Sequence, residues 1–215
     1  HMKNTALSGK SWTSSKKISD ETDLFALLLE QENLTDPAEI QKCLSPSLED
    51  LHDPFTMSGM TEAVNRIQKA IKNKERIMVY GDFDTDGITS TVILVQGIRN
   101  LGGEVSYRIP CRVNHSHGLK NKIIDEITSK EVKLLITCDC GINDNAEVSH
   151  AKSLGLDVII TDHHDPDAKR FPTDAIAVLN PLQENCNYPC KTLAGAGVAL
   201  KVVQALLNNP PPDKG

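Results

Sequence analysis

The chain has 215 residues, of which 39% are hydrophobic and 24% are charged. This composition is ordinary for a soluble globular protein, and the length suits one large domain or a core domain with a small appendage. No apolar run is long enough to span a bilayer, which excludes a membrane-spanning protein. The net charge of −6 is opposite in sign to that of most nucleic-acid-binding domains, so a DNA groove would need local basic clusters or a region outside this chain.

The first part of the chain is expected to be helical after a polar arm. Residues 1–20 form that arm; the first two are typical of a tag-cleavage remnant, and no signal peptide follows them. A helical lead-in is predicted over 21–73, with helices at 23–31, from Asp36-Pro37 onward, and at 61–73. Aspartate followed by proline is typical of a helix start, and apolar residues at helical spacing indicate the third helix. We expect this section to pack on the sheet core.

An acidic turn follows the first predicted strand, and the rest of the chain is organised around it. Residues 76–79 are an apolar run of strand type, and 89–101 has the apolar spacing of a helix. Between them lie Asp82, Asp84 and Asp86. Because alternate side chains of extended backbone point the same way, the three carboxylates are expected to share one face and to raise one another's pKa unless a cation lies between them. Such hard oxygen ligands favour Mg²⁺ or Mn²⁺.

Polar groups also end two later strands. Residues 134–138 form a buried-type strand followed by Asp139, and 157–161 form another followed by Asp162-His163-His164. The alternation of strands and helices over 74–207 predicts an α/β fold, with a doubly wound, mainly parallel sheet and helices on both faces. The carboxyl ends of parallel strands meet at one edge, where aspartates and a histidine would suit a two-metal centre that activates water and clamps a phosphate.

The loop after a predicted strand at 104–109 carries cationic side chains. Arg112 could contact a phosphate, because a guanidinium matches phosphate oxygens bidentately, and a plain surface arginine is an equal alternative. His115 and His117 could reach substrate or metal, although solvent-facing loop histidines are more common. The next predicted helix after Asp139 runs from 142 to 154.

The last predicted helix follows a glycine-rich segment and runs through residue 207. Gly195 and Gly197 allow a close backbone approach, either to the sheet or to a phosphate-bearing ligand, and close packing is the preferred interpretation. Residues 208–215 are proline-rich and polar, which is typical of a chain end.

Six cysteines are scattered along the chain, several in apolar strand contexts. That distribution is typical of reduced thiols and predicts a cytoplasmic location. Cys186 and Cys190 could be half of a zinc site, but no partner pair with metal spacing exists, so ordinary loop cysteines are the preferred interpretation.

Several of these segments resemble the motifs of a known family. The runs Gly81-Asp-Phe-Asp-Thr-Asp-Gly87, Asp139-Cys-Gly141 and Asp162-His163-His164 are similar to the first three motifs of the DHH phosphoesterases. Leu51-His-Asp-Pro-Phe55 and Leu193-Ala-Gly-Ala-Gly-Val-Ala-Leu-Lys201 resemble the RecJ-type single-strand-specific exonucleases within that family. The motifs fall in the family's order and span most of the chain, which is far more specific than any one of them.

The resemblance implies a set of metal ligands. Asp84, Asp86, Asp139 and His163 would hold Mn²⁺ or Mg²⁺ in a two-metal site, with Asp139 bridging the two ions because a carboxylate has two oxygens to share. Asp82 would ligate directly, or hold a ligand or the attacking water.

The resemblance also implies roles for residues around the ions. His164 would face the scissile phosphate as a hydrogen-bond donor or charge stabiliser. Asp162 would orient a histidine from behind. His117 stands where a tyrosine is usual in RecJ-type sequences.

One element of the family pattern departs from expectation. The family has a fourth motif with a further metal-binding aspartate, and Asp213, in Pro-Pro-Pro-Asp-Lys, does not match it. The family's C-terminal substrate-gripping domain is also expected to be absent. We therefore expect this chain to fold, to bind metal weakly or at one site, and to have low or no nuclease activity.

The resemblance implies metal-dependent hydrolysis of phosphodiester bonds in single-stranded DNA from the 5′ end, in DNA repair and recombination. Its implied partners are single-stranded DNA and a single-strand-binding protein or a helicase, with no membrane. Two alternatives stay open. One is another DHH phosphodiesterase acting on short oligonucleotides or cyclic dinucleotides, and the other is a non-catalytic nucleic-acid-binding or replisome scaffold.

Overall fold

The computed structural model describes residues 21–111 and 117–208. The chain divides into two compact units, His1–Leu51 and His52–Gly215. The predicted polar arm at 1–20, and Arg112, His115 and Asp213, lie outside the described residues. The boundaries of a catalytic domain at 21–207 stay a prediction.

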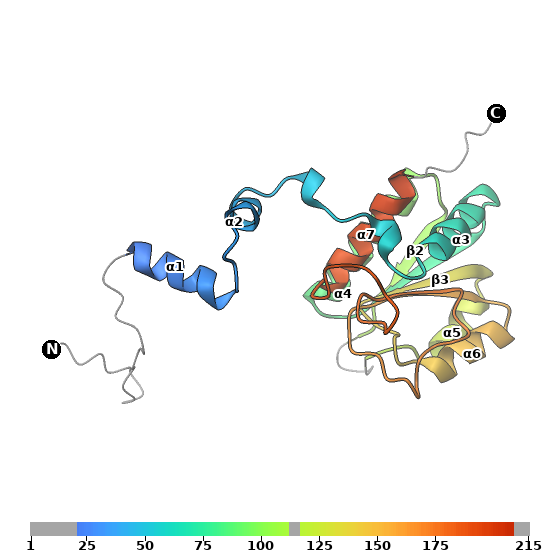
Figure 1. The fold of residues 1–215 in the computed structure, drawn as a ribbon. Helices are drawn as coiled ribbons and strands as arrows, with labels where there is room; N and C mark the ends of the chain where they lie inside the picture. The colour runs from blue at the N-terminus through green and yellow to red at the C-terminus, as the bar shows by residue number, and fades with distance from the viewer. Residues whose placement is uncertain (1–20, 112–116, 209–215) are drawn as a thin grey trace. The chain divides into compact units, whose positions relative to one another are not determined.

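The described part of the first unit is helical, as expected. It holds α1 (Glu21–Gln31), α2 (Pro37–Leu44) and the short 3-10 helix η1 (Leu48–Asp50) (Figure 1). Asp36 precedes α2, and its Oδ1 accepts a hydrogen bond of 2.9 Å from the backbone N–H of Ala38. This contact satisfies one of the donors that a helix N-terminus leaves unpaired, which is why the Asp36-Pro37 pair starts the helix here.

The second unit is built on one parallel sheet. Its strands are β1 (Arg76–Gly81), β2 (Val105–Arg108), β3 (Val132–Cys138), β4 (Asp157–Thr161) and β5 (Ala177–Leu179). All four pairings are parallel, in the order β2-β1-β3-β4-β5. The predicted doubly wound α/β sheet is confirmed. None of the helices in the described part of the chain is long and apolar enough to cross a membrane.

Helices cover both faces of the sheet because each strand alternates its side chains between them. Ile77 and Val79 of β1 belong to one apolar cluster, and Met78 and Tyr80 belong to the other. The first cluster also contains residues of α3 (Met60–Lys72), α4 (Thr85–Asn100) and α7 (Gly195–Asn208). The second contains residues of α5 (Asn121–Thr128) and α6 (Asn145–Ser153). Figure 1 shows these two groups of helices on opposite sides of the strands.

The start of α4 differs from the prediction. The helix begins at Thr85 rather than at residue 89, because Oδ1 of Asp84 accepts a hydrogen bond of 2.9 Å from the N–H of Gly87 and caps it. Asp86 therefore lies in the first helical turn. The expectation that Asp82, Asp84 and Asp86 share one face of extended backbone is wrong, because helical geometry turns Asp86 away from that alternation.

The start of α6 also differs from the prediction. The helix begins at Asn145, not at residue 142. The N–H of Ile142 donates a hydrogen bond of 3.0 Å to Oδ2 of Asp162, and the N–H of Asp144 donates one of 3.1 Å to the carbonyl oxygen of Gly141, so these residues form a turn before the helix. The intervening loop thus stays at the sheet edge.

Within the second unit, the segment that begins at His52 contacts the last helix. Nζ of the buried Lys201 in α7 donates a hydrogen bond of 2.8 Å to the carbonyl oxygen of His52. The ring of His52 meets that of Tyr188 edge-on, with centroids 5.9 Å apart. Asp53 then caps the short helix η2 (Pro54–Thr56), which leads towards α3. Two segments that carry the RecJ resemblance are therefore packed together for structural reasons.

Candidate metal centre

The acidic motifs meet at the carboxyl edge of three neighbouring strands. Asp82 follows β1, Asp139 follows β3 and Asp162 follows β4. Gly81 of β1 is paired with Cys138 of β3, and Cys138 is paired with Thr161 of β4, so the three strands end level with one another. The order β1-β3-β4 therefore brings together side chains that are far apart in the sequence.

Two sets of ligand atoms lie close enough to hold a metal ion. Asp82, Asp84 and Asp139 form one set, and Asp139, His163 and His164 form the other; within each set the atoms lie within 4.8 Å of one another. Asp139 belongs to both sets. A carboxylate shared between two ligand sets is the arrangement that a bridging role requires.

The environment of Asp139 favours the binding of a cation. Its side chain is 2% exposed, and burial, followed by the charges of Asp86 and Asp84, raises its pKa to about 8. Its Oδ1 accepts no hydrogen bond from the described residues, although Nε2 of His163 lies 3.1 Å away without hydrogen-bond alignment. A buried acceptor of this kind is costly unless a ligand satisfies it. Carboxylate oxygens and imidazole nitrogen together fit a divalent ion such as Mn²⁺.

Asp86 and His163 lie on the other side of that carboxylate. Nε2 of His163 is 3.5 Å from Oδ2 of Asp86. The two carboxylate oxygens of Asp86 also accept hydrogen bonds from the N–H groups of Gly195, at 2.7 Å, and Ala196, at 2.8 Å. The N-terminus of α7 carries positive partial charge, so these two hydrogen bonds attract the Asp86 side chain and fix its position.

Asp162 makes hydrogen bonds to both histidines. Its Oδ1 accepts from the backbone N–H of His163, at 2.7 Å, and lies 2.7 Å from Nδ1 of His164. Although burial opposes it, the hydrogen bond with His164 lowers the pKa of Asp162, and the same bond raises the pKa of His164 to about 9. This geometry fits the predicted orienting role of Asp162 and the predicted role of His164 as a hydrogen-bond donor or charge stabiliser.

His117 contacts Asp82 at the centre and also faces solvent, so both alternatives considered for it describe part of its position. Its Nδ1 lies 2.6 Å from Oδ2 of Asp82, and its ring is tilted against that of Phe83 with centroids 4.5 Å apart. Its side chain is still 71% exposed, so it stands at the rim. The only hint in the sequence was its place in the family motif, because an exposed loop histidine has no burial pattern.

The two glycines proposed as substrate contacts lie against side chains. A Cβ on Gly195 would be 2.9 Å from Cβ of Asp139, and a Cβ on Gly197 would be 3.0 Å from Cδ2 of Leu193. Both distances support the close-packing interpretation. Gly87 is tighter still, since a Cβ there would be 2.5 Å from the backbone of Asp82.

A cavity of about 420 Å³ adjoins the centre. Its lining comprises Asp82, His117, Gly118, Asp139, Cys140, Gly141, Ile142, Asn143, Asp144, Asp162, His164 and Arg170. No pattern in the sequence singled out Asn143, Asp144 or Arg170 for this site. Burial raises the pKa of Asp144, while the N–H of Leu119, 2.7 Å from its Oδ2, opposes that rise.

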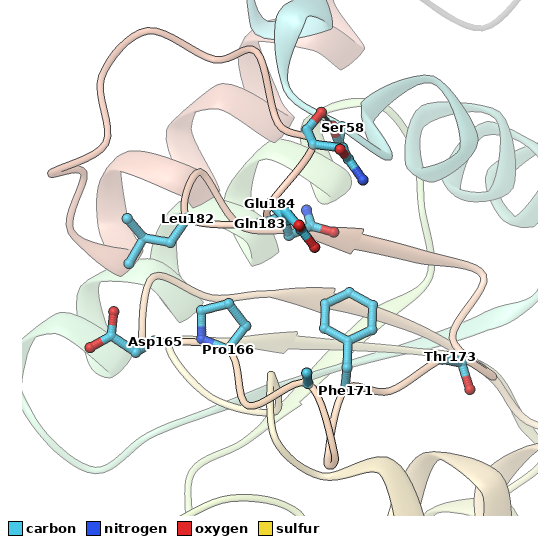
Figure 2. Close-up of a pocket in the computed structure, with 10 residues that line it drawn as sticks. Ser58, Asp165, Pro166, Phe171, Thr173, Leu182, Gln183 and Glu184 are labelled. Carbon is cyan, nitrogen blue, oxygen red and sulfur yellow. Dashed lines mark hydrogen bonds between the residues drawn. The ribbon is translucent and has the colours of Figure 1, made fainter.

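A larger cavity of about 680 Å³ is lined by Ser58 and by residues from the segment 165–185, and none of the metal-centre candidates lines it. Figure 2 shows Asp165, Pro166 and Phe171 facing Leu182 and Glu184 across this space. With two carboxylates and no lysine or arginine in its lining, this cavity is a poor place for an anion.

Known proteins share much of this sequence. The chain is 42% identical to the single-stranded-DNA-specific exonuclease RecJ of Bacillus subtilis (strain 168) over 190 residues, which are 88% of this chain and 24% of that protein. It is also 42% identical to RecJ of Escherichia coli (strain K12) over 151 residues, which are 70% of this chain and 26% of that protein. The chain therefore spans about a quarter of the length of these relatives.

Solved structures agree with this similarity. A crystal structure of RecJ in complex with Mn²⁺ from Thermus thermophilus superposes with a TM-score of 0.67 at 31% identity, covering 88% of this chain and 26% of that one. A crystal structure of exonuclease RecJ bound to manganese gives a TM-score of 0.65 at 34% identity, covering 73% and 40% respectively. The resemblance to RecJ-type exonucleases is confirmed. A model of the DHH family, N-terminal domain, matches residues 76–214, more than half of the sequence, and the chain therefore belongs to the DHH family.

Proposed function

We propose that this chain is the metal-dependent catalytic core of a single-strand-specific DNA exonuclease that hydrolyses phosphodiester bonds from the 5′ end. The observation that carries the proposal is Asp139, a buried carboxylate shared by two sets of potential ligands. The similarity to RecJ exonucleases supports single-stranded DNA as the substrate. Because the chain spans only about a quarter of those relatives, activity by the 215-residue chain alone is expected to be low.

The ligands of the proposed centre are Asp82, Asp84, Asp86, Asp139 and His163. Bound Mn²⁺ or Mg²⁺ would supply a water nucleophile at neutral pH and offset the charge of the phosphate. Asp139 would be shared between two ions, because it alone belongs to both ligand sets among the described residues. His164, held by Asp162, would donate a hydrogen bond to a phosphate oxygen as charge develops there.

The proposal is tested by comparing substrates in Mn²⁺. We would incubate the 215-residue chain, and a form extended towards the length of its relatives, with 5′-labelled single-stranded DNA, 3′-labelled single-stranded DNA, duplex DNA and a cyclic dinucleotide. Release of labelled mononucleotides from the 5′ end of single strands only is the expected result. Preference for the cyclic dinucleotide would instead indicate another kind of DHH phosphodiesterase. Binding of single strands without hydrolysis by either form would indicate a scaffold.

Substitutions test the ligand assignment. Asp84→Ala and His163→Ala should abolish turnover, because each removes a proposed ligand. Asp125→Ala is a matched control, since Asp125 is an exposed α5 aspartate whose Oδ1 lies 2.7 Å from Nε2 of His150. If both ligand variants keep the activity of the parent, the assignment is wrong.

We further propose that the protein works in the cytoplasm on strands presented by a single-strand-binding protein or a helicase. Within the part of the chain that the structure describes, Cys43, Cys138, Cys140, Cys186 and Cys190 are not joined by disulfides, which supports a reducing compartment. Coating the DNA with a single-strand-binding protein should change the rate of hydrolysis if that partnership exists, and an identical rate would speak against it.

A further inference from the structure

The cavity beside the metal centre has an unusual balance of charge. Four of its lining residues are aspartates, namely Asp82, Asp139, Asp144 and Asp162. Arg170 is the only lysine or arginine among the described residues that line it. Metal ions in the proposed centre would offset charge near Asp82 and Asp139, but they do not account for an arginine placed in the same space.

The loop that carries Arg170 is fastened in place. Nδ2 of Asn143 donates to the carbonyl oxygen of Asp165 at 3.0 Å, and Oδ1 of Asn143 accepts from the N–H of Asp167 at 2.7 Å. The N–H of Arg170 itself donates to the carbonyl oxygen of Asp167 at 2.9 Å. The next residue, Phe171, packs against the apolar cluster on the α5 and α6 side of the sheet.

In this loop the neighbouring side chains of Arg170 and Phe171 line different cavities. Phe171 lies in the larger cavity, as Figure 2 shows, whereas Arg170 lines the cavity of the metal centre. The larger cavity contains Asp165 and Glu184 and would repel a phosphate. Of these two cavities, the one that Arg170 lines is therefore the one whose described lining offers a cationic side chain to a phosphate.

The guanidinium of Arg170 is available to a ligand. Within residues 21–111 and 117–208 the guanidinium makes no hydrogen bond or ion pair. Its positive charge slightly offsets the rise in the pKa of Asp144. An arginine offers five N–H donors in a planar fork that matches the oxygens of a phosphate. Single-stranded DNA carries such a group on every nucleotide, so a strand whose scissile phosphate lies at the metal centre brings further phosphates into the adjoining cavity.

We propose that Arg170 forms a phosphate-binding subsite for single-stranded DNA, engaging a backbone phosphate next to the one that is cleaved. Asn143 is the positioning residue that holds the loop for it. The subsite rests on the proposed function, because it takes a second phosphate of the same substrate.

The test compares Arg170→Ala, Arg170→Lys and Lys169→Ala. Lys169 is the matched control, because it is the neighbouring cation of the same loop and is exposed but does not line the cavity. Binding of a fluorescent deoxythymidine oligonucleotide would be followed by anisotropy in Mn²⁺ at several salt concentrations. Arg170→Ala should weaken binding about 10-fold and lower the salt dependence by about 0.7 in log–log slope, as the loss of one phosphate contact on a single strand requires. Arg170→Lys should retain part of the affinity, and Lys169→Ala should stay within about twofold of the parent.

A second readout separates a subsite from a general effect of charge or folding. The Mn²⁺-induced rise in melting temperature should be equal in the parent and in Arg170→Ala. Equal losses in Arg170→Ala and Lys169→Ala, or oligonucleotide binding unaffected by Arg170→Ala, would overturn the subsite alone. If the parent binds no oligonucleotide in Mn²⁺, the proposed function fails and the subsite falls with it.

Discussion

The backbone N–H of Gly195 donates a hydrogen bond of 2.7 Å to Oδ2 of Asp86, a residue 109 positions earlier in the chain. The contact joins the first turn of α4 to the first turn of α7, and Ala196 adds a second bond to the other oxygen of the same carboxylate. Asp86, a proposed metal ligand in α4, thus also caps α7, and the two helices pack against each other. Structural stability and the proposed metal centre would therefore depend on the same side chain.

Replacing Asp86 with alanine should therefore destabilise the protein even without metal. Two N–H groups at the start of α7 would lose their acceptor, and the expected cost is about 1–2 kcal/mol in free energy of unfolding. Urea denaturation in EDTA measures this cost. Asp86→Asn is the matched variant, because it keeps a carbonyl acceptor and removes a charge near Asp139. Its loss of free energy of unfolding should therefore be smaller than that of Asp86→Ala. An Asp86→Ala variant as stable as the parent would show that the capping contact contributes nothing.

Adding a methyl group at Gly195 should disturb the centre directly. The new Cβ would lie 2.9 Å from Cβ of Asp139, so the proposed bridging carboxylate must shift. We expect Gly195→Ala to weaken Mn²⁺ binding about 10-fold or more and to cost about 1–3 kcal/mol of stability. Gly197→Ala is the control in the same helix, because the nearest atom to its Cβ would be the movable Cδ2 of Leu193 rather than a proposed metal ligand. Calorimetric titration with Mn²⁺ separates the two, and equal affinities would contradict the close contact.

Manganese should raise the melting temperature of the parent chain. A divalent ion relieves the repulsion among the carboxylates around Asp139, and a ligand at about 100 times its dissociation constant stabilises the folded state by about 2.7 kcal/mol. Differential scanning fluorimetry with and without millimolar Mn²⁺ measures the shift. His163→Ala and Asp139→Ala should show little of it. A parent melting curve that does not respond to Mn²⁺ would count against the whole centre.

Stability in the absence of metal should fall as the pH rises. Asp139 has a pKa of about 8 in the folded state, against 3.8 for an unburied aspartate, so the folded state holds its proton more tightly. Its contribution is complete below the lower value and is lost as pH rises towards the higher one, and His164, with a pKa raised to about 9, acts in the same direction. In EDTA we expect the free energy of unfolding to drop by about 1–3 kcal/mol between about pH 5 and about pH 8.

Asp139→Asn tests the origin of that slope. The amide has nearly the same shape and does not titrate, so the decline with pH should be shallower in this variant. Denaturation at three pH values in EDTA measures the slope for both proteins, and identical slopes would exclude Asp139 as the source. Saturating Mn²⁺ should also flatten the slope of the parent, because an ion competes with the proton for the same oxygen.

Local patterns in the sequence determined the fold class and most of the elements. Apolar runs such as 157–161 are typical of strands buried on both faces of a parallel sheet, and their alternation with amphipathic segments predicts helices on each side. The same logic placed Asp82, Asp139 and Asp162 after strands, hence at one edge. Helix starts were less accurate, because the caps at Asp84 and the turn at Gly141 depend on contacts that a hydropathy pattern does not contain.

Only the tertiary structure decided which partner each side chain of that edge has. It places Asp139 in both ligand sets, binds Asp86 to the start of α7, and brings His117 and Arg170 to the cavity. The physical reason is that these contacts join segments separated by tens of residues, and their geometry depends on strand order, register and loop anchoring. A sequence specifies the donors and acceptors, whereas the packed sheet and helices set the distances between them.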